Sequence, residues 1–212
     1  MKKIILSFFI CLFVTALASA QTDYAPTFEA GVKAGADYSS FPSYPTFTNK
    51  SEFAYIGGFW ANMTLFNVVN FQPEIYGTEK RVDVTYNLPG NIYSERSQIT
   101  SVDVPLLFGG KFGSPNFGVR VYTGPLLSLA ISKVQSFTND NIEPQRLDYK
   151  DENIAWQIGA GLNIKPFTID ARYEYGINSV GYGPTPSSST HLNVVSLTIG
   201  YTLFSSFGND LY

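Results

Sequence analysis

The charged residues that could do chemistry lie closest together within residues 167–176. Asp170, Arg172 and Glu174 alternate with apolar residues there, so an extended chain points all three side chains to one face. Two carboxylates on one face resemble the pair with which glycoside hydrolases act. Nothing in the sequence marks either carboxylate as the proton donor, however, and charges on one strand face also form structural ion pairs. We therefore favour a structural role for this group over catalysis.

A second candidate is the single histidine, His191. A serine nucleophile would need it as a base, and Ser187, Ser188 and Ser189 precede it closely. We favour the simpler interpretation, a loop-edge histidine beside a serine-rich loop. One histidine cannot supply the usual multi-histidine metal site, and the only cysteine, Cys11, lies in an apolar run. We predict no catalytic residue, no metal ligand and no cofactor.

The element that must position Asp170, Arg172 and Glu174 is a hairpin over residues 153–178. Apolar side chains occupy one parity from 154 to 164 and the other parity from 167 to 177, on either side of Lys165 and Pro166. This pattern predicts two strands, each with one apolar and one polar face. Each has about 11 residues, at about 3.3 Å per residue, which is long enough to cross a bilayer at a tilt.

The same alternation recurs along the rest of the chain. The further predicted strands are residues 27–38, 53–66, 69–82, 97–112, 117–132 and 191–204. Short connections at 67–68, 113–116 and 165–166 alternate with long polar ones at 39–52, 86–97, 133–152 and 179–190. An even strand count with this alternation is typical of membrane barrels, whose longer loops face outside. The sequence predicts an all-β fold, a transmembrane antiparallel up-and-down β-barrel of about eight strands.

The two ends of the chain are expected to lie outside the barrel. Residues 1–20 have the pattern of a signal peptide: Lys2 and Lys3, then an apolar run, then Ala18, Ser19 and Ala20. We predict cleavage at this point, a barrel over residues 21–204 and a short C-terminal extension over residues 205–212. Export by this signal predicts a place in the cell outer membrane.

The composition agrees with a membrane barrel and argues against some partners. Aromatic residues make up 16% of the chain, with 14 tyrosines and 17 phenylalanines, as the aromatic girdles of a barrel require. An ordinary β-sandwich is the alternative that composition alone leaves open. The 14 basic and 17 acidic residues form no basic cluster, so nucleic acid is not an expected partner.

The polar parity of the predicted strands carries nearly all of their charges. A barrel of about eight strands has room inside only for side chains, so acids and bases there must pair across the lumen. We predict a structural ionic network that fills the lumen, and we favour it over a gate or proton path. Its members are Glu29, Lys33, Glu74, Asp103, Arg120, Asp170, Arg172 and Glu174.

Four segments in order resemble a known family. They are SVDVPLLFGGKF (101–112), VRVYTGPLLSLA (119–130), IGAGLNIKPFTIDARYEYGIN (158–178) and VVSLTIGYTLF (194–204). Together they resemble the PorT-like outer-membrane β-barrel family, over residues 27–204. The resemblance implies an integral outer-membrane barrel of a Gram-negative cell without catalytic residues to carry over. One branch of that family serves a protein secretion system. The residues after Phe204 depart from such barrels, which commonly stop at a terminal aromatic.

These observations favour a non-catalytic outer-membrane barrel with a structural or interaction role through its extracellular loops. The expected partners are outer-membrane lipid, the barrel insertion machinery and a protein or surface ligand at the loops. Three alternatives stay open: an accessory component of a PorT-type secretion system, a small pore, and a lipid-modifying enzyme that uses His191 at the rim.

Overall fold

The computed structural model describes residues 26–40, 47–51, 53–66, 68–88, 91–114, 116–137, 151–178, 180–181 and 189–206. The predicted signal peptide lies outside these residues, and so do residues 207–212 of the predicted C-terminal extension. Within the described ranges no helix is long and apolar enough to cross a membrane.

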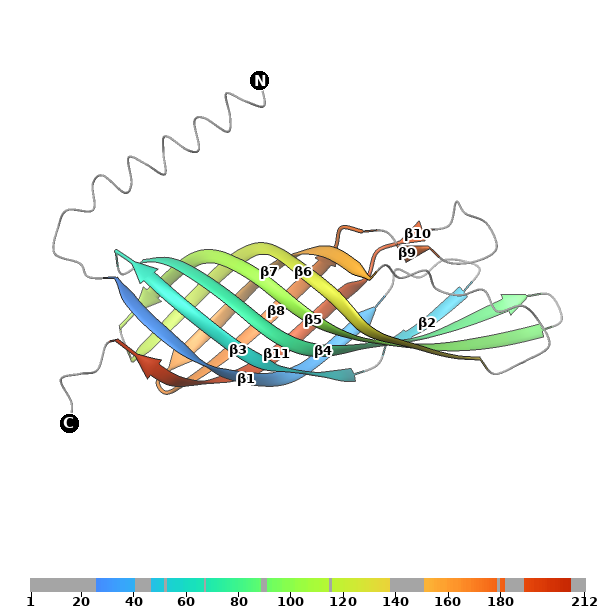
Figure 1. The fold of residues 1–212 in the computed structure, drawn as a ribbon, viewed down its shortest axis with the longest axis horizontal. Coiled ribbons are helices and arrows are strands. Elements are labelled where there is room, and N and C mark those ends of the chain that lie inside the picture. Colours follow the sequence, from blue (N-terminus) through green and yellow to red (C-terminus); the bar gives the residue numbers. More distant parts are fainter. Residues whose placement is uncertain are drawn as a thin grey trace, which may run out of the picture.

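Eight long antiparallel strands form the wall of the molecule (Figure 1). They are β1 (Thr27–Ser40), β3 (Phe53–Leu65), β4 (Val69–Leu88), β5 (Asn91–Gly113), β6 (Phe117–Phe137), β7 (Glu152–Ile164), β8 (Phe167–Gly176) and β11 (Asn193–Ser205). Three short strands accompany them: β2 (Phe47–Ser51), β9 (Val180–Gly181) and β10 (Ser189–Thr190).

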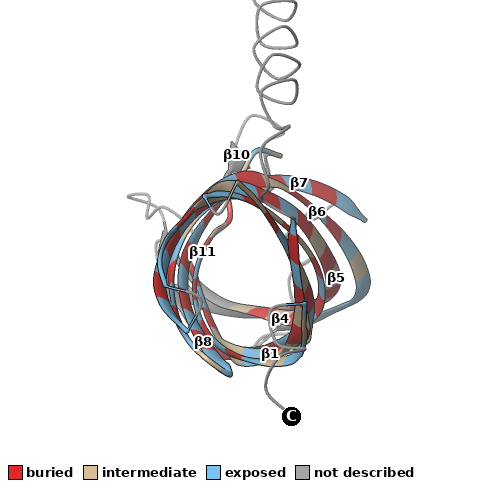
Figure 2. Cartoon of the chain, turned by 90° about the vertical axis from the view of Figure 1, so that its left-hand side faces the viewer, coloured by how far each residue is buried: buried red, intermediate tan, exposed pale blue. Residues whose placement is uncertain are grey.

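The eight long strands close into a barrel. The pairing runs β4-β3-β1-β11-β8-β7-β6-β5, and β5 pairs with β4 again to complete the ring. The first strand therefore meets the last, with Val32 opposite Tyr201 and Ala36 opposite Leu197. Seen along its axis the wall is a ring of strands around one lumen (Figure 2). The predicted antiparallel barrel of eight strands is confirmed.

The alternation of apolar and polar residues separates the two faces of the wall. Along β7 and β8, buried and exposed residues alternate almost without exception. The apolar side chains are the exposed ones: Trp156 is 47% and Ile158 58% exposed, although both are large and hydrophobic. The dry face of the predicted hairpin therefore points out of the barrel, and the polar face points into the lumen. The alternating burial colours along the strands of the ring follow the same pattern (Figure 2).

Two belts of exposed aromatic side chains bound this apolar band. At the end where β1 begins and β11 finishes (Figure 1), Phe28 contacts Phe204 with ring centroids 6.0 Å apart. At the other end Tyr38 contacts Phe53 at 5.2 Å. Tyr38 lies ten residues after Phe28 on β1. At about 3.3 Å per residue and a strand tilt of about 40°, this stretch rises about 25 Å along the barrel axis. That is about the height of the apolar band of an outer-membrane barrel.

The three short connections lie together at one end of the barrel. The links between β3 and β4, β5 and β6, and β7 and β8 span only residues 66–68, 114–116 and 165–166. They lie at the end that also holds the start of β1 and the finish of β11, which we call the short-turn end (Figure 1). The opposite end is the long-hairpin end. The predicted alternation of connection lengths is confirmed for these three short turns.

The prediction of a loop over residues 86–97 is wrong. The structure continues β4 to Leu88 and begins β5 at Asn91, so the two strands project beyond the barrel as a ribbon paired up to Leu88 opposite Asn91. The sequence there still alternates β-branched and aromatic residues with polar ones, as in Val82 and Val84, and such residues favour strands. Pro89 and Gly90 are turn-forming residue types and predict a loop, but the described residues on both sides of them are paired strands.

Strands also replace parts of the other predicted loops. Within residues 39–52, β2 pairs with β4 along the ribbon, from Phe47 opposite Tyr86 to Ser51 opposite Val82. Within residues 133–152, β6 continues to Phe137, which pairs with Glu95 of β5. The result is an antiparallel sheet in the order β2-β4-β5-β6 beyond the wall, at the long-hairpin end (Figure 1). Within residues 179–190, β9 and β10 pair as a short hairpin.

Candidate functional site: the charged lumen

The centre of the lumen is occupied by one carboxylate and two cations. Arg172 on β8 donates two parallel hydrogen bonds to Glu74 on β4, at 2.6 Å from Nη1 and 2.7 Å from Nη2. Lys33 on β1 also bonds the Glu74 carboxylate. All three side chains are nearly inaccessible to solvent. Strands β8 and β4 lie four places apart in the ring, so the Arg172 to Glu74 pair joins opposite walls.

A second ion pair lies beside the first. Arg120 on β6 donates from Nη2 to Asp170 on β8 at 2.9 Å, and from Nη1 to the Gln72 side chain at 2.9 Å. The Tyr122 hydroxyl links the two groups, because it donates to Asp170 at 2.8 Å and accepts from Arg172 Nε at 3.0 Å. The middle of the lumen therefore holds one continuous network of charge-assisted hydrogen bonds.

A third group lies nearer the long-hairpin end. Lys80 on β4 bonds Asp103 of the neighbouring strand β5 and Glu174 of the opposite strand β8, each at 3.0 Å. The Ser101 and Ser128 hydroxyls donate to Asp103 at 2.7 and 2.5 Å. Two carboxylates thus share one ammonium group, and hydroxyl donors satisfy part of the remaining oxygen capacity.

The fourth group lies at the short-turn end. Glu29 on β1 pairs with Lys111 on β5 at 3.2 Å and with Lys165, from the turn between β7 and β8, at 2.8 Å. The side chain of Lys165 is more accessible than that of Lys111, 19% against 9%. This pair of cations closes the lumen where it meets solvent.

These groups follow from the closed ring and the inward parity. A buried ion costs several kcal/mol unless it is paired and hydrogen-bonded, and an interior of eight strands leaves no room for a hydrated counter-ion. All eight residues of the predicted network are buried. The structure distributes them over the four groups described above. Asp170 and Glu174, which the sequence suggested as a carboxylate pair, have different cation partners, Arg120 and Lys80.

The histidine at the rim has a defined environment. His191 Nδ1 lies 2.8 Å from the Gly176 carbonyl oxygen, and the imidazole stacks on Tyr175 with centroids 5.4 Å apart. Ser187 and Ser188 fall outside the described residues, and of Ser189 the structure describes only the backbone. In the part of the chain that is described, no three His, Cys, Asp or Glu side chains are placed to hold a metal ion.

Residues 18–181 match the family described as "Outer membrane protein beta-barrel domain". The chain belongs to this family. The eight-stranded wall, its exposed apolar band and the family match together place this outer membrane protein in the outer membrane, with lipid around the band. The match is to the broad family, and the narrower PorT-like resemblance stays a prediction.

Solved outer-membrane barrels are similar to this barrel at low identity. Ail of Yersinia pestis, in complex with a heparin analogue, shares 12% identity over 85% of this chain and 100% of that chain, with a TM-score of 0.42. OprG from Pseudomonas aeruginosa shares 11% over 84% and 95%, at 0.47. The outer membrane enzyme PagL shares 13% over 84% and 99%, at 0.38. No curated protein matches the chain. Likeness at this level bears on neither the ligand nor the activity of this barrel.

The sequence analysis missed several uncharged members of the lumen. Tyr76, Tyr122 and Gln157 carry hydrogen bonds within the network, and each lies on the inward parity, which could have revealed it. It also missed an apolar cluster inside the barrel, formed by Ile56, Tyr76, Leu126 and Ala155. Apolar side chains on a polar parity break the alternation. These four side chains come from strands that are far apart in the sequence, and only the closed ring brings them into contact.

Proposed function

We propose that this outer-membrane barrel is a closed, non-catalytic anchor that presents the sheet at its long-hairpin end to a partner outside the cell. The observation that carries the proposal is the Arg172 to Glu74 pair, which joins opposite walls at the centre of the lumen. A lumen filled by paired side chains holds the wall together and leaves no continuous water path. The barrel then fixes the ribbon in space without transporting a solute.

The sheet beyond the wall supports the second half of the proposal. Strands β2, β4, β5 and β6 pair there above the level of the aromatic belt, so a rigid ladder extends well past the lipid. Short turns of outer-membrane barrels face the periplasm, which directs this sheet to the outside. Binding surfaces placed on such extended elements are held by the scaffold beneath them.

Planar-bilayer recording tests the closed state. The purified barrel should give no steady conductance, and neither should a Glu79→Gln variant, which changes a charge outside the paired lumen groups. Glu74→Gln removes the carboxylate between two buried cations and is the variant most expected to leak. Steady conductance of the unaltered protein would support the pore alternative and overturn the closed anchor.

Crosslinking on intact cells tests the presenting sheet. A variant that joins β4 to β5 by a short turn, in place of residues 82–97, removes the strand segments that pair with β2 and with the end of β6. It should insert as well as the unaltered barrel and lose surface crosslinks. Equal crosslinks in both proteins would reject the sheet as the contact surface. Crosslinks that persist and join the barrel to a secretion apparatus from the periplasmic side would favour the PorT-type alternative instead.

A further inference from the structure

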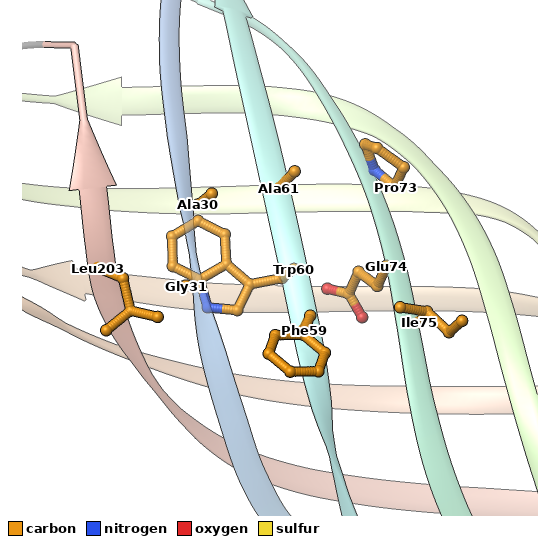
Figure 3. A pocket seen from close by; sticks show the side chains of 9 residues that line it. All are labelled: Ala30, Gly31, Phe59, Trp60, Ala61, Pro73, Glu74, Ile75 and Leu203. Carbon is orange, nitrogen blue, oxygen red and sulfur yellow. The ribbon is translucent and has the colours of Figure 1, made fainter.

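A hollow of about 450 Å³ opens on the outer face of the wall across β1, β3 and β4 (Figure 3). Its volume falls within the roughly 300 to 1,000 Å³ of small-molecule sites. Small residues and a proline form the floor of the hollow, and larger apolar side chains project around it. The lining residues are Ala30, Gly31, Phe59, Trp60, Ala61, Pro73, Glu74, Ile75 and Leu203.

The hollow exists because three neighbouring strands carry small outward residues at one level. Ala30 of β1 lies opposite Ala61 of β3, and Pro73 follows on β4. The ladder between β3 and β4 passes from Trp60 opposite Glu74 to Met63 opposite Phe71, with no paired position at Ala61. Proline has no backbone N–H to donate, which accounts for the gap.

The indole of Trp60 lies directly behind the hollow, next to Gly31 (Figure 3). A Cβ at position 31 would meet the Tyr201 carbonyl and, at 3.0 Å, the Trp60 ring. Glycine is therefore required at this position, first by the close Tyr201 backbone of the neighbouring strand and then by the indole. Trp60 Nε1 donates to the Val32 carbonyl at 3.2 Å, which holds the indole in place.

The place of the hollow in the membrane decides what it can hold. Ala30 lies two residues from Phe28, an aromatic of the belt at the short-turn end, toward the middle of the apolar band. Phe59, Ile75 and Leu203 are 62%, 50% and 65% exposed in that band, where lipid surrounds the barrel. Of the lining side chains only Glu74 is charged, and Arg172 and Lys33 occupy its carboxylate.

From these observations we infer that the hollow is a binding site for one acyl chain of a membrane phospholipid. An acyl chain needs no polar partner and fits against Ala30, Gly31 and Ala61, between the projecting side chains of Phe59, Ile75 and Leu203. Dispersion contacts with both sides of a groove exceed those with a convex wall. The chain in the hollow is therefore retained longer than the lipids around it. This site is distinct from the outer sheet of the proposed function.

Trp60 reports directly on the hollow. The sequence has two tryptophans, and Trp156→Phe removes the other one. In that background, reconstitution into phosphatidylcholine that carries bromine atoms in the middle of one acyl chain should quench Trp60 fluorescence, since bromine quenches only near contact. Adding Ala61→Phe fills the hollow and should abolish most of the quenching. Ala30→Leu fills it from β1 and serves if the first variant does not fold.

Ala160→Phe is the matched control. It adds the same side chain to the outer face of β7, four strands from β3 in either direction around the ring. Quenching should persist in this control. Equal quenching in the control and in a folded Ala61→Phe variant would overturn the proposal, and so would absence of quenching in the Trp156→Phe background. Disulfide-linked dimers of an Ala61→Cys variant would assign the hollow to a second copy and reject the lipid.

Discussion

Glu74 is the lumen residue whose loss should destabilise the barrel most. It is the common partner of Arg172 and Lys33, both of which are buried with it. Together with Arg120 and Asp170, these residues form a central group of three cations and two carboxylates. Glu74→Gln keeps the shape and leaves three cations against one carboxylate. Arg172→Met leaves two charges of each sign.

The expected magnitudes follow from that balance. Breaking a buried ion pair so that a charge loses its partner costs about 3 to 5 kcal/mol. Glu74→Gln should lie at the upper end of this range. It removes the carboxylate that Lys33 pairs with, and it leaves Arg172 only a 3.8 Å pair with Asp170, which Arg120 already holds at 2.9 Å. Arg172→Met should lie at the lower end of the same range, because Lys33 still neutralises Glu74 and the group keeps equal numbers of positive and negative charges. The carboxylate should therefore matter more than the arginine, although the arginine makes the two well-formed bonds.

Urea unfolding of the barrel in detergent micelles measures this difference. The transition is followed by tryptophan fluorescence and by the heat-dependent shift in electrophoretic mobility, and the two probes should agree. Glu79→Gln is the control on the same strand, where the pair with Arg81 is partly exposed and should contribute at most about 1 kcal/mol. A smaller loss for Glu74→Gln than for Arg172→Met would refute the charge-balance argument.

Three further outcomes are expected. Ile158→Arg, in the middle of the apolar band, should lower the free energy of unfolding by about 2 to 4 kcal/mol in the same urea assay. Ser132→Arg, near the rim at the long-hairpin end, should lower it by at most about 1 kcal/mol. His191→Ala should leave lipid A unchanged by mass spectrometry, and a changed profile would support the enzyme alternative. Replacing residues 82–97 by a short turn should keep the heat-dependent mobility shift, because the pairs of the wall, from Arg81 opposite Gln98 downward, are untouched.

The architecture was predictable because it rests on local pattern. Period-two alternation along β7 and β8 specifies which side chains share a face, and the short turns fix which strands are neighbours. An apolar face too long for a soluble strand leaves lipid as its surroundings. Outward Trp156 and inward Arg172 follow from these rules without any knowledge of distant contacts.

The pairings inside the lumen were not predictable in the same way. Arg172 and Glu74 are 98 residues apart in sequence, and parity says only that both point inward. Which cation meets which carboxylate depends on closure of the ring and on the stagger between strands. The ribbon was missed for a different reason: Pro89 and Gly90 are strong turn signals in the sequence, but a turn signal does not say how far the strands on either side of it extend.

The cross-lumen pairs also limit what this barrel could do as a gate. Opposite walls are joined at two levels, by Arg172 to Glu74 and by Lys80 to Glu174. A water path needs both levels open together, and each open pair leaves buried ions that cost several kcal/mol apiece. A ligand could open the lumen only through its difference in affinity for the open and closed states.

Moving the barrel population from about 1:99 open to closed to about 99:1 takes about 5.5 kcal/mol of such differential binding. Contacts at the outer sheet that leave the lumen unchanged need none of this energy, which is why a function outside the wall fits the closed barrel better than transport through it.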